Sequence, residues 1–268
     1  MANNNDTMGK TLFVVVALCL VCSIIVAGSA VGLKPTQEQQ KLLDKQRNVL
    51  EVSGLLGNIT LSGEQIRDLY ANRIDSKLVD LKSGDFVNED PDKFDRDRAL
   101  KDSSQSIALD RKDDPSGLRR RTNLAQVYLV RDEDKKISQV ILPINGNGLW
   151  SMMYAFVSVK VDGNTVVGVN YYDQGETPGL GDEVTNMKWR NLWPGKKLFD
   201  DSGKVAIHLI KGRADPSDPY AVDGVSGATL TSRGVTNMFN FWMGDLGYGP
   251  FLKKVREGLL TQGEQKNG

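Results

Sequence analysis

Two short segments rich in glycine and hydroxyl-bearing residues could do chemistry. The first reads ETPGLG over residues 176–181, and the second reads DGVSGATLT over residues 223–231. Small residues at 226–228 would let a bulky anion approach the backbone, directly before a stretch with helical periodicity. The first N–H groups of a helix lack intrahelical partners and carry the positive end of its dipole. The second segment is therefore a candidate phosphate site, with Thr229 and Thr231 supplying hydroxyls.

Both segments also have simpler interpretations. Serine and threonine often cap helices, and spacing alone favours Ser226 or Thr229 as a cap. In the first segment, Gly179 and Gly181 permit a turn, Thr177 offers a hydroxyl, and Leu180 offers an apolar edge to a planar ring. The alternative is a plain glycine- and proline-containing connection from a strand to a helix.

Other chemistries find little support in the sequence. It lacks the G-x-S-x-G and HExxH motifs of hydrolases and a G-x-G-x-x-G dinucleotide site. The only cysteines, Cys19 and Cys22, lie in an apolar run and are interpreted as small hydrophobes. The single histidine, His208, alternates within a predicted strand and is expected to be structural. Basic and acidic residues number 34 each, which argues against a nucleic-acid partner.

The elements that must position the two segments belong to an α+β fold, an antiparallel sheet packed by helices. Apolar residues after Gly227 recur at helical spacing, and Gly244 and Gly247 should end that helix. A helical stretch is expected near 182–192. Runs of β-branched and aromatic residues separated by turn residues predict an antiparallel meander and one further strand. They cover residues 126–131, 138–144, 151–161, 165–172 and 205–211.

One long apolar run lies near the N-terminus. Residues 11–33 carry no charge and no proline, and about 20 such residues can span a bilayer. A cleaved signal peptide competes, but the run is longer than a typical signal core. A retained transmembrane helix is therefore favoured, after a tail of residues 1–10. Flanking charges hardly decide its orientation, although a short tail usually stays cytoplasmic and would export the large domain.

Residues 34–125 are expected to form a helical and extended region, followed by the domain of residues 126–268 that holds the site. Residues 35–80 look helical, with a capping-box pattern at 62–65. Residues 84–121 are charge-dense, which predicts an exposed arm. The run Arg119-Arg120-Arg121 could bind an anion, but a solvated basic cluster is the favoured interpretation.

The two glycine-rich segments, in this order and after a single N-terminal span, resemble the C subunit of the bacterial sodium-translocating NADH:quinone oxidoreductase. The sequence NGNGLW at 145–150 also matches, and SMMYAF follows it directly. So does FWMGDLGYGPFL at 241–252. The resemblance covers essentially the whole chain and is weakest over residues 84–121.

This resemblance implies a covalently held cofactor. FMN would be joined through its phosphate to the threonine after Ser-Gly-Ala, here Thr229. An exported flavin transferase would make the bond, taking FMN from FAD. The chain would then be an electron-transfer subunit of a multi-subunit complex in the bacterial inner membrane, spanning it once with its large domain in the periplasm.

The resemblance also implies roles for individual residues. Backbone amides near 227–231 should bind the phosphate, and Asp223 and Ser226 should form the pattern that the transferase recognises. Trp150 is a candidate stacking wall that could instead belong to the core. Lys211 is a candidate cation near the phosphate or the ring that could instead be a solvated strand end. The remaining candidates should line the ring, the ribityl chain or the phosphate: Glu176, Thr177, Gly179, Leu180, Gly181, Gly227, Ala228 and Thr231.

Two alternatives remain open on the sequence. One is the flavin subunit of the related ion-translocating ferredoxin:NAD oxidoreductase, which shares the anchor and an S/T-G-A-T site. The other is a cofactor-free membrane-anchored scaffold, in which the glycines form turns and Thr229 caps a helix. Flavin absorbance that survives denaturation and desalting would exclude the scaffold.

Overall fold

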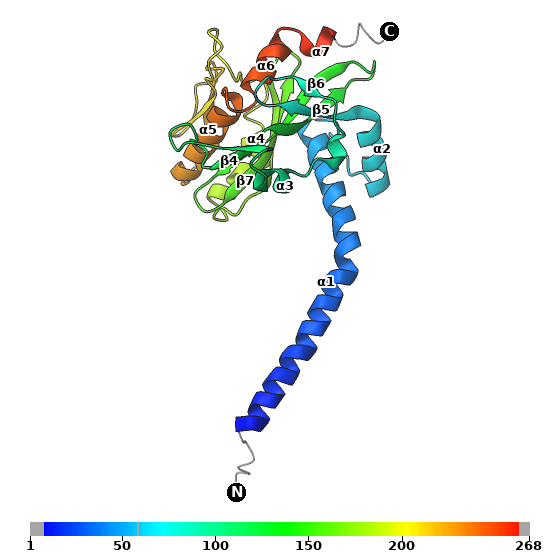
Figure 1. Ribbon diagram of the computed structural model, residues 1–268. Coiled ribbons are helices and arrows are strands. Elements are labelled where there is room, and N and C mark those ends of the chain that lie inside the picture. The colour runs from blue at the N-terminus through cyan, green and yellow to red at the C-terminus, as the bar shows by residue number, and fades with distance from the viewer. Residues whose placement is uncertain (1–7, 58, 263–268) are drawn as a thin grey trace. The chain divides into compact units, whose positions relative to one another are not determined.

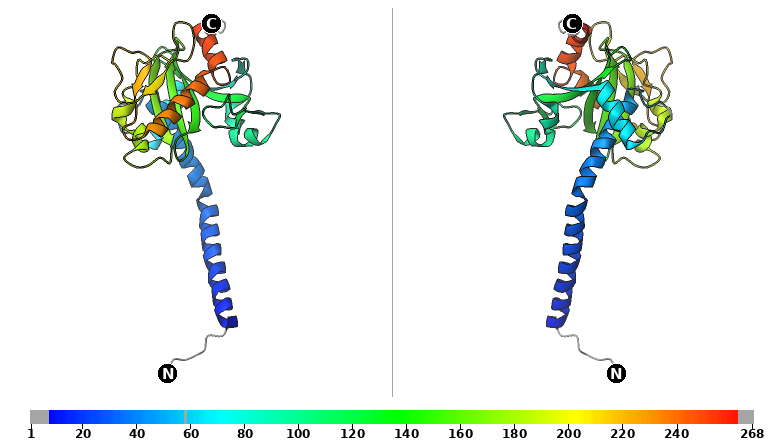
Figure 2. Two further views of the ribbon diagram at one scale, coloured as in Figure 1. Left: turned by 90° about the vertical axis from the view of Figure 1, so that its left-hand side faces the viewer. Right: turned by 90° about the vertical axis from the view of Figure 1, so that its right-hand side faces the viewer.

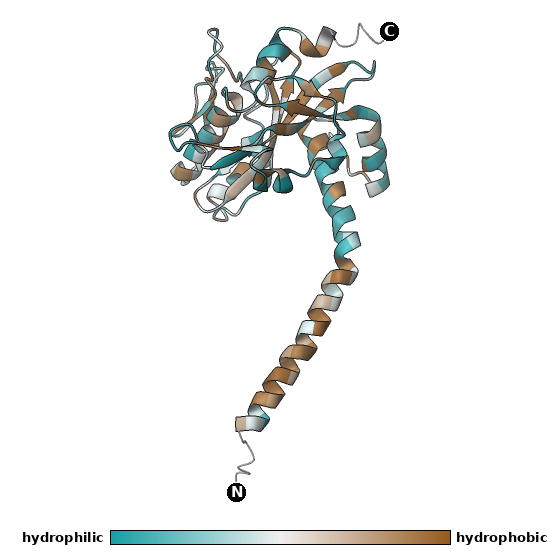
Figure 3. Ribbon diagram, in the orientation of Figure 1, coloured by the Kyte–Doolittle hydropathy of each residue, from teal (hydrophilic) through white to brown (hydrophobic). Residues whose placement is uncertain are grey.

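The computed structural model describes residues 8–57 and 59–262, and the chain divides into two compact units after Lys45. Helix α1 runs from Met8 to Val52 as one continuous helix with Pro35 inside it. By length and composition its apolar part is able to cross a membrane, and hydrophobic residues dominate the N-terminal part of the helix in Figure 3. The predicted span at 11–33 therefore lies within a longer helix, whose last residues are buried in the second unit.

A six-stranded antiparallel sheet forms the centre of the second unit (Figure 1). Its strand order is β2-β1-β5-β6-β7-β8. The last four strands are joined in sequence order, which confirms the predicted meander. The strands are β1 (Ile74–Asp80), β2 (Phe86–Val87), β5 (Leu124–Arg131), β6 (Ile137–Asn147), β7 (Met152–Lys160) and β8 (Val166–Asp173).

The first strand of this sheet departs from the sequence-based expectation. The sequence indicates a helical stretch through residues 74–80, yet they form β1 and pair with β5 along its whole length. Long-range pairing decides this segment, because its own residues alternate too weakly to predict a strand. Since β1 and β5 share one sheet, the structure also departs from the division expected at residue 126, and the described residues from Gln46 onward form one compact unit. The predicted capping box is confirmed: Ser62 and Gln65 open helix α2 (Gly63–Arg73).

The charge-dense segment 84–121 is more ordered than an exposed arm. Aspartates cap its short helices, and Ala99, Ser106 and Ser116 are buried. Arg121 is only 5% exposed and donates a 2.8 Å hydrogen bond to the Thr122 carbonyl, so the prediction of a solvated cluster is wrong for this residue. Besides β2, the segment contains η1 (Pro91–Lys93), α3 (Arg96–Lys101), β3 (Ser106–Ala108) and β4 (Arg120–Thr122), of which β3 and β4 pair as a separate hairpin.

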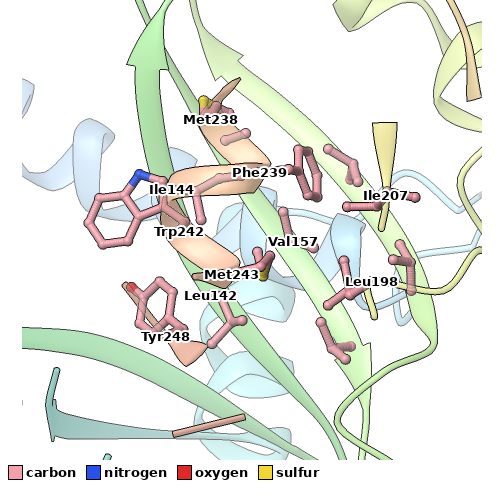
Figure 4. Packing of buried hydrophobic residues seen from close by; sticks show 14 of the residues in the cluster. Leu142, Ile144, Val157, Leu198, Ile207, Met238, Phe239, Trp242, Met243 and Tyr248 are labelled. Carbon is pink, nitrogen blue, oxygen red and sulfur yellow. The ribbon is translucent and has the colours of Figure 1, made fainter. Parts of the chain in front are cut away.

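Helix α5 (Thr229–Met243) covers one face of the sheet and buries most of its apolar side chains there. Figure 4 shows Met238, Phe239 and Trp242 of this helix packed close to Leu142 and Ile144 of β6. The helix ends at Met243, just before Gly244, as predicted. A packed helix of this kind fixes its own N-terminus relative to the sheet, which matters for the site.

The opposite face of the sheet is covered by α2 and the end of α1 (Figure 2). The Asn170 amide donates to Asn48 Oδ1 at 3.0 Å, and Arg190 pairs with Glu51 at 2.8 Å. Short elements complete the unit and confirm an α+β fold. They are η2 (Gly181–Thr185), α4 (Met187–Arg190), β9 (His208–Ile210), β10 (Ala221–Asp223), α6 (Gly249–Arg256) and α7 (Leu259–Gln262).

The strand expected at 205–211 is shorter than predicted and lies outside the main sheet. Only His208–Ile210 form β9, which pairs in parallel with β10. His208 Nδ1 lies 2.8 Å from the Ala206 carbonyl oxygen, consistent with the expected structural role. Because β10 leads into the second glycine-rich segment, this pair sets where that segment begins.

Candidate functional site

The two glycine-rich segments lie against each other. Gly227 has φ +73°, a conformation that side chains rarely adopt, and an added Cβ there would lie 2.9 Å from Leu180 Cδ2. An added Cβ on Gly181 would lie 2.8 Å from Thr231 Oγ1. Glycine at both positions therefore lets residues 176–181 approach the beginning of α5.

Thr229 is the first residue of α5, and it is exposed. Ala228 occupies the N-cap position without a side-chain hydrogen bond, so neither Ser226 nor Thr229 caps the helix. Within residues 8–57 and 59–262, the amides of residues 229–231 donate to no protein acceptor. An exposed hydroxyl thus stands beside a row of free N–H groups at the positive end of a fifteen-residue helix.

The turn before α5 is held by a short network of hydrogen bonds. The Ser232 hydroxyl accepts from the Val225 amide at 2.9 Å and donates to the Ala228 carbonyl at 3.0 Å. The Asp223 carboxylate accepts from the Ala214 amide at 2.8 Å, and its carbonyl accepts from Trp189 Nε1 at 2.9 Å. This network fixes the backbone around Ser226, Gly227 and Thr229. Asp223 therefore has a structural role in this turn.

A pocket of about 710 Å³ opens beside Thr229, between the residues that follow β9 and the first turns of α5. Lys211 lines it together with Arg213 and Arg233, and its predicted role as a cation near the phosphate or the ring stays a prediction. None of the three forms an ion pair within the described residues, and Asp223 is the only acidic residue of the lining. Neither arginine was predicted from the sequence, although Arg233 lies one helical turn after Thr229 and that spacing could have indicated it.

Glu176 is turned inward, contrary to the expectation that it lines a cofactor. It is 5% exposed. Its Oε1 accepts from the amides of Trp150 and Ser151 at 2.9 and 3.3 Å. Its Oε2 accepts from the Leu149 amide at 3.1 Å and from the Thr231 hydroxyl at 2.6 Å. Burial alone would raise the pKa of this carboxyl, but the hydrogen bonds from Thr231 and the three amides outweigh it and lower the pKa below its ordinary value.

Trp150 is exposed and does not belong to the core. Seventy per cent of it is accessible, and its indole Nε1 donates to Thr177 Oγ1 at 3.0 Å. Leu180 and Leu230, which flank Gly227 and Thr229, are also exposed. Apolar side chains thus border the start of α5 on the side of residues 176–181. Gly179, with φ +72° and open space around it, serves the turn.

Thr229, Ser226, Gly227 and Lys211 therefore gather at one end of α5, and Thr177, Leu180 and Trp150 lie beside them. Thr231 and Glu176 are buried beneath. The arrangement combines free amide donors, a cationic pocket and an exposed apolar border. Those are the features that a phosphorylated ligand with an aromatic ring requires.

Comparison with known proteins identifies the class of this domain. The family model described as "FMN-binding domain" matches residues 148–244, a range that contains both glycine-rich segments and the pocket. The second unit thus contains an FMN-binding domain.

Similar full-length proteins and a solved structure identify the family. The chain is 60% identical over 260 residues to the C subunit of the Na⁺-translocating NADH-quinone reductase of Yersinia pestis, with 97% of each chain covered. It is 52% identical to the protein of the same name from Pasteurella multocida, over 98% of this chain and 100% of that one. The crystal structure of Shewanella oneidensis NqrC matches with a TM-score of 0.75 and 38% identity, over 83% of this chain and 100% of that one. The chain belongs to the family of the C subunits of the Na⁺-translocating NADH-quinone reductases.

Proposed function

We propose that this chain carries FMN joined by a phosphoester to Thr229 Oγ, and that it relays electrons within a membrane-bound NADH:quinone reductase. The observation that carries the proposal is the exposed Thr229 hydroxyl at the N-terminus of α5, next to amides without protein acceptors. The names of the relatives support the sodium-translocating complex rather than the related ferredoxin:NAD oxidoreductase.

The residues around Thr229 fit a phosphate group. The free amides of residues 229–231 are donors aimed outward from the helix, and they suit a negatively charged oxygen. Lys211, Arg213 and Arg233 add positive charge in the adjoining pocket. Gly227, with φ +73°, allows the left-handed turn directly before these free amides, a conformation that other residues rarely adopt.

The apolar border suits the ring of the cofactor. Trp150 offers an exposed aromatic face, and Leu180 offers an aliphatic one. FMN, when bound, supplies the electron-carrying chemistry. A phosphoester lies far from the isoalloxazine ring, so it retains and places the cofactor, whereas the surrounding residues tune its reduction potential.

The same proposal also includes the location of the protein and its partners. We infer that α1 crosses the bacterial inner membrane once, that residues 1–10 stay in the cytoplasm, and that the FMN-binding domain lies in the periplasm. An exported flavin transferase would then transfer FMN from FAD to Thr229 Oγ, breaking the pyrophosphate bond so that AMP leaves. It would read Asp223 and Ser226 as part of its target. Other subunits of the complex would supply and accept the electrons, and the exposed Trp150, Leu180 and Leu230 leave the flavin open to such partners.

The experiment is a pair of variants produced together with a flavin transferase. Thr229→Ala should lose all flavin absorbance after denaturation and desalting, because it lacks the attachment oxygen. Thr231→Ser keeps a hydroxyl at a buried position and should retain covalent flavin at the wild-type level. Flavin that still migrates with denatured Thr229→Ala protein would overturn the assignment of Thr229.

A further inference from the structure

The Glu176 carboxylate lies where three parts of the proposed FMN site meet. Its oxygens accept hydrogen bonds from three consecutive amides of residues 149–151, the segment that carries Trp150. They also accept from Thr231, which lies two residues after Thr229 in the first turn of α5. Glu176 itself opens the segment 176–181. One buried group therefore connects the aromatic side of the site to the side that holds the attachment threonine.

The surroundings of Glu176 are built around a carboxylate in particular. Three of the four partners are backbone amides, which can only donate, and they contact both carboxylate oxygens, so both oxygens must accept. An added Cβ on Gly148 would lie 2.4 Å from Glu176 Oε1, and one on Gly181 would lie 2.8 Å from Glu176 Cβ. Glycine at both positions thus makes room for this side chain. A glutamine would bring an NH₂ group against backbone donors and leave amides unsatisfied in a buried place.

The Trp150 side chain is hydrogen-bonded to the segment that Glu176 opens. It is mostly exposed, and its indole N–H hydrogen bond goes to Thr177, the residue directly after Glu176. Its position therefore depends on its own amide and on this neighbouring hydroxyl, both of which are tied to Glu176.

We propose that Glu176 is a positioning residue that fixes Trp150 relative to the Thr229 hydroxyl and so determines where the flavin ring lies, without contacting the flavin. The effect on the flavin ring rests on the proposed function, whereas the connection between Glu176 and Trp150 concerns the chain alone. Thr231 acts through Glu176, because its hydroxyl is buried and already donates to the carboxylate. Thr231 is therefore a second positioning residue and not an attachment site.

The first test uses the full-length protein in detergent before any flavin is attached. Hydrogen exchange of the amides of residues 149–151 reports directly whether these amides are hydrogen-bonded to Glu176. Glu176→Gln should exchange them at least about tenfold faster, as expected when hydrogen bonds to a charged acceptor are lost. Thr231→Val should give a smaller increase, and Thr231→Ser should match the wild type. Glu133→Gln makes the same chemical change in the exposed connection between β5 and β6 and serves as the control.

The second test uses protein carrying covalent flavin. Glu176→Gln and Thr231→Val should keep flavin on Thr229, yet show lower flavin fluorescence anisotropy and a shifted midpoint potential, because Trp150 no longer holds the ring. The double variant, Glu176→Gln with Thr231→Val, should show the same anisotropy and midpoint potential as Glu176→Gln alone, since both residues act through one connection. If Glu176→Gln does not fold, the comparison of Thr231→Val with Thr231→Ser decides the question.

The outcomes separate the inference from the proposed function. Unchanged exchange of the three amides in Glu176→Gln, or in Thr231→Val where the first variant does not fold, would overturn the inference while leaving covalent FMN intact. Faster exchange of these amides, with unchanged flavin anisotropy and midpoint potential, would refute the claim that Glu176 determines where the flavin ring lies. Wild-type protein with flavin attached elsewhere than Thr229 would instead overturn the proposed function, whatever the exchange experiment shows.

Discussion

Replacing Gly181 by alanine should disrupt the connection between the two glycine-rich segments. The new Cβ would lie 2.8 Å from both Glu176 Cβ and Thr231 Oγ1, in a buried place, so at least one of them must shift. Overpacking of this kind typically costs about 1–3 kcal/mol of folding free energy. The shift would also break or lengthen the 2.6 Å hydrogen bond between Thr231 and Glu176. We expect the urea midpoint of the full-length protein in detergent to fall accordingly.

Gly179→Ala provides a matched control two residues away. Gly179 has a left-handed φ of +72°, but no atom lies within 4 Å of the position of an added Cβ. This variant should lose about 1–2 kcal/mol from backbone strain alone. Only Gly181→Ala should also speed the exchange of the amides of residues 149–151 and lower the flavin anisotropy. Equal exchange rates in the two variants would refute the argument that Gly181 makes room for Glu176.

Three further predictions concern charge. Because the pKa of Glu176 lies below the ordinary carboxyl value of 4.5, its stabilising hydrogen bonds are fully present above that value and are lost as pH falls through the lower, folded-state pKa. Exchange protection of the amides at 149–151, measured from pH 6 downward, should therefore persist at pH 4.5, and loss already near pH 6 would contradict this. Arg190→Gln removes the partly buried pair with Glu51 and should lower the unfolding free energy in urea by about 1.5–3 kcal/mol, whereas no change would mean that the pair contributes nothing. Arg233→Gln should slow covalent flavin attachment about two- to fivefold, as expected for one exposed charge, while Lys188→Gln outside the pocket should not.

The sequence predicted the parts of the fold whose signals are local. The strands β5 to β8 alternate strongly and are separated by clear turn residues, and α5 has a regular apolar face that ends before Gly244. Strand β1 was missed because its pairing with β5 joins residues about fifty positions apart. Burial of Arg121 was missed for a related reason, since a run of three arginines looks solvated until the surrounding short elements are known.

For the candidate site, the sequence pointed to the two segments that the structure brings together, but it did not give the direction of each side chain. Thr229 begins α5 and Lys211 lines the adjoining pocket, and their roles toward FMN stay predictions. Glu176 was expected to face the cofactor, but it faces three amides from a loop 25 to 27 residues earlier in the chain. Such a contact depends on how β7 and β8 bring two loops together, and nothing in the local sequence specifies it.

The central claim is that Thr229 carries FMN through a phosphoester. The most direct measurement is a peptide map by mass spectrometry of the full-length protein, produced together with a flavin transferase and purified under denaturing conditions. The account predicts that the peptide spanning residues 223–231 gains the mass of FMN less one water, and that fragmentation assigns this mass to Thr229. An unmodified peptide, or the added mass on Thr231 or Ser226, would contradict it.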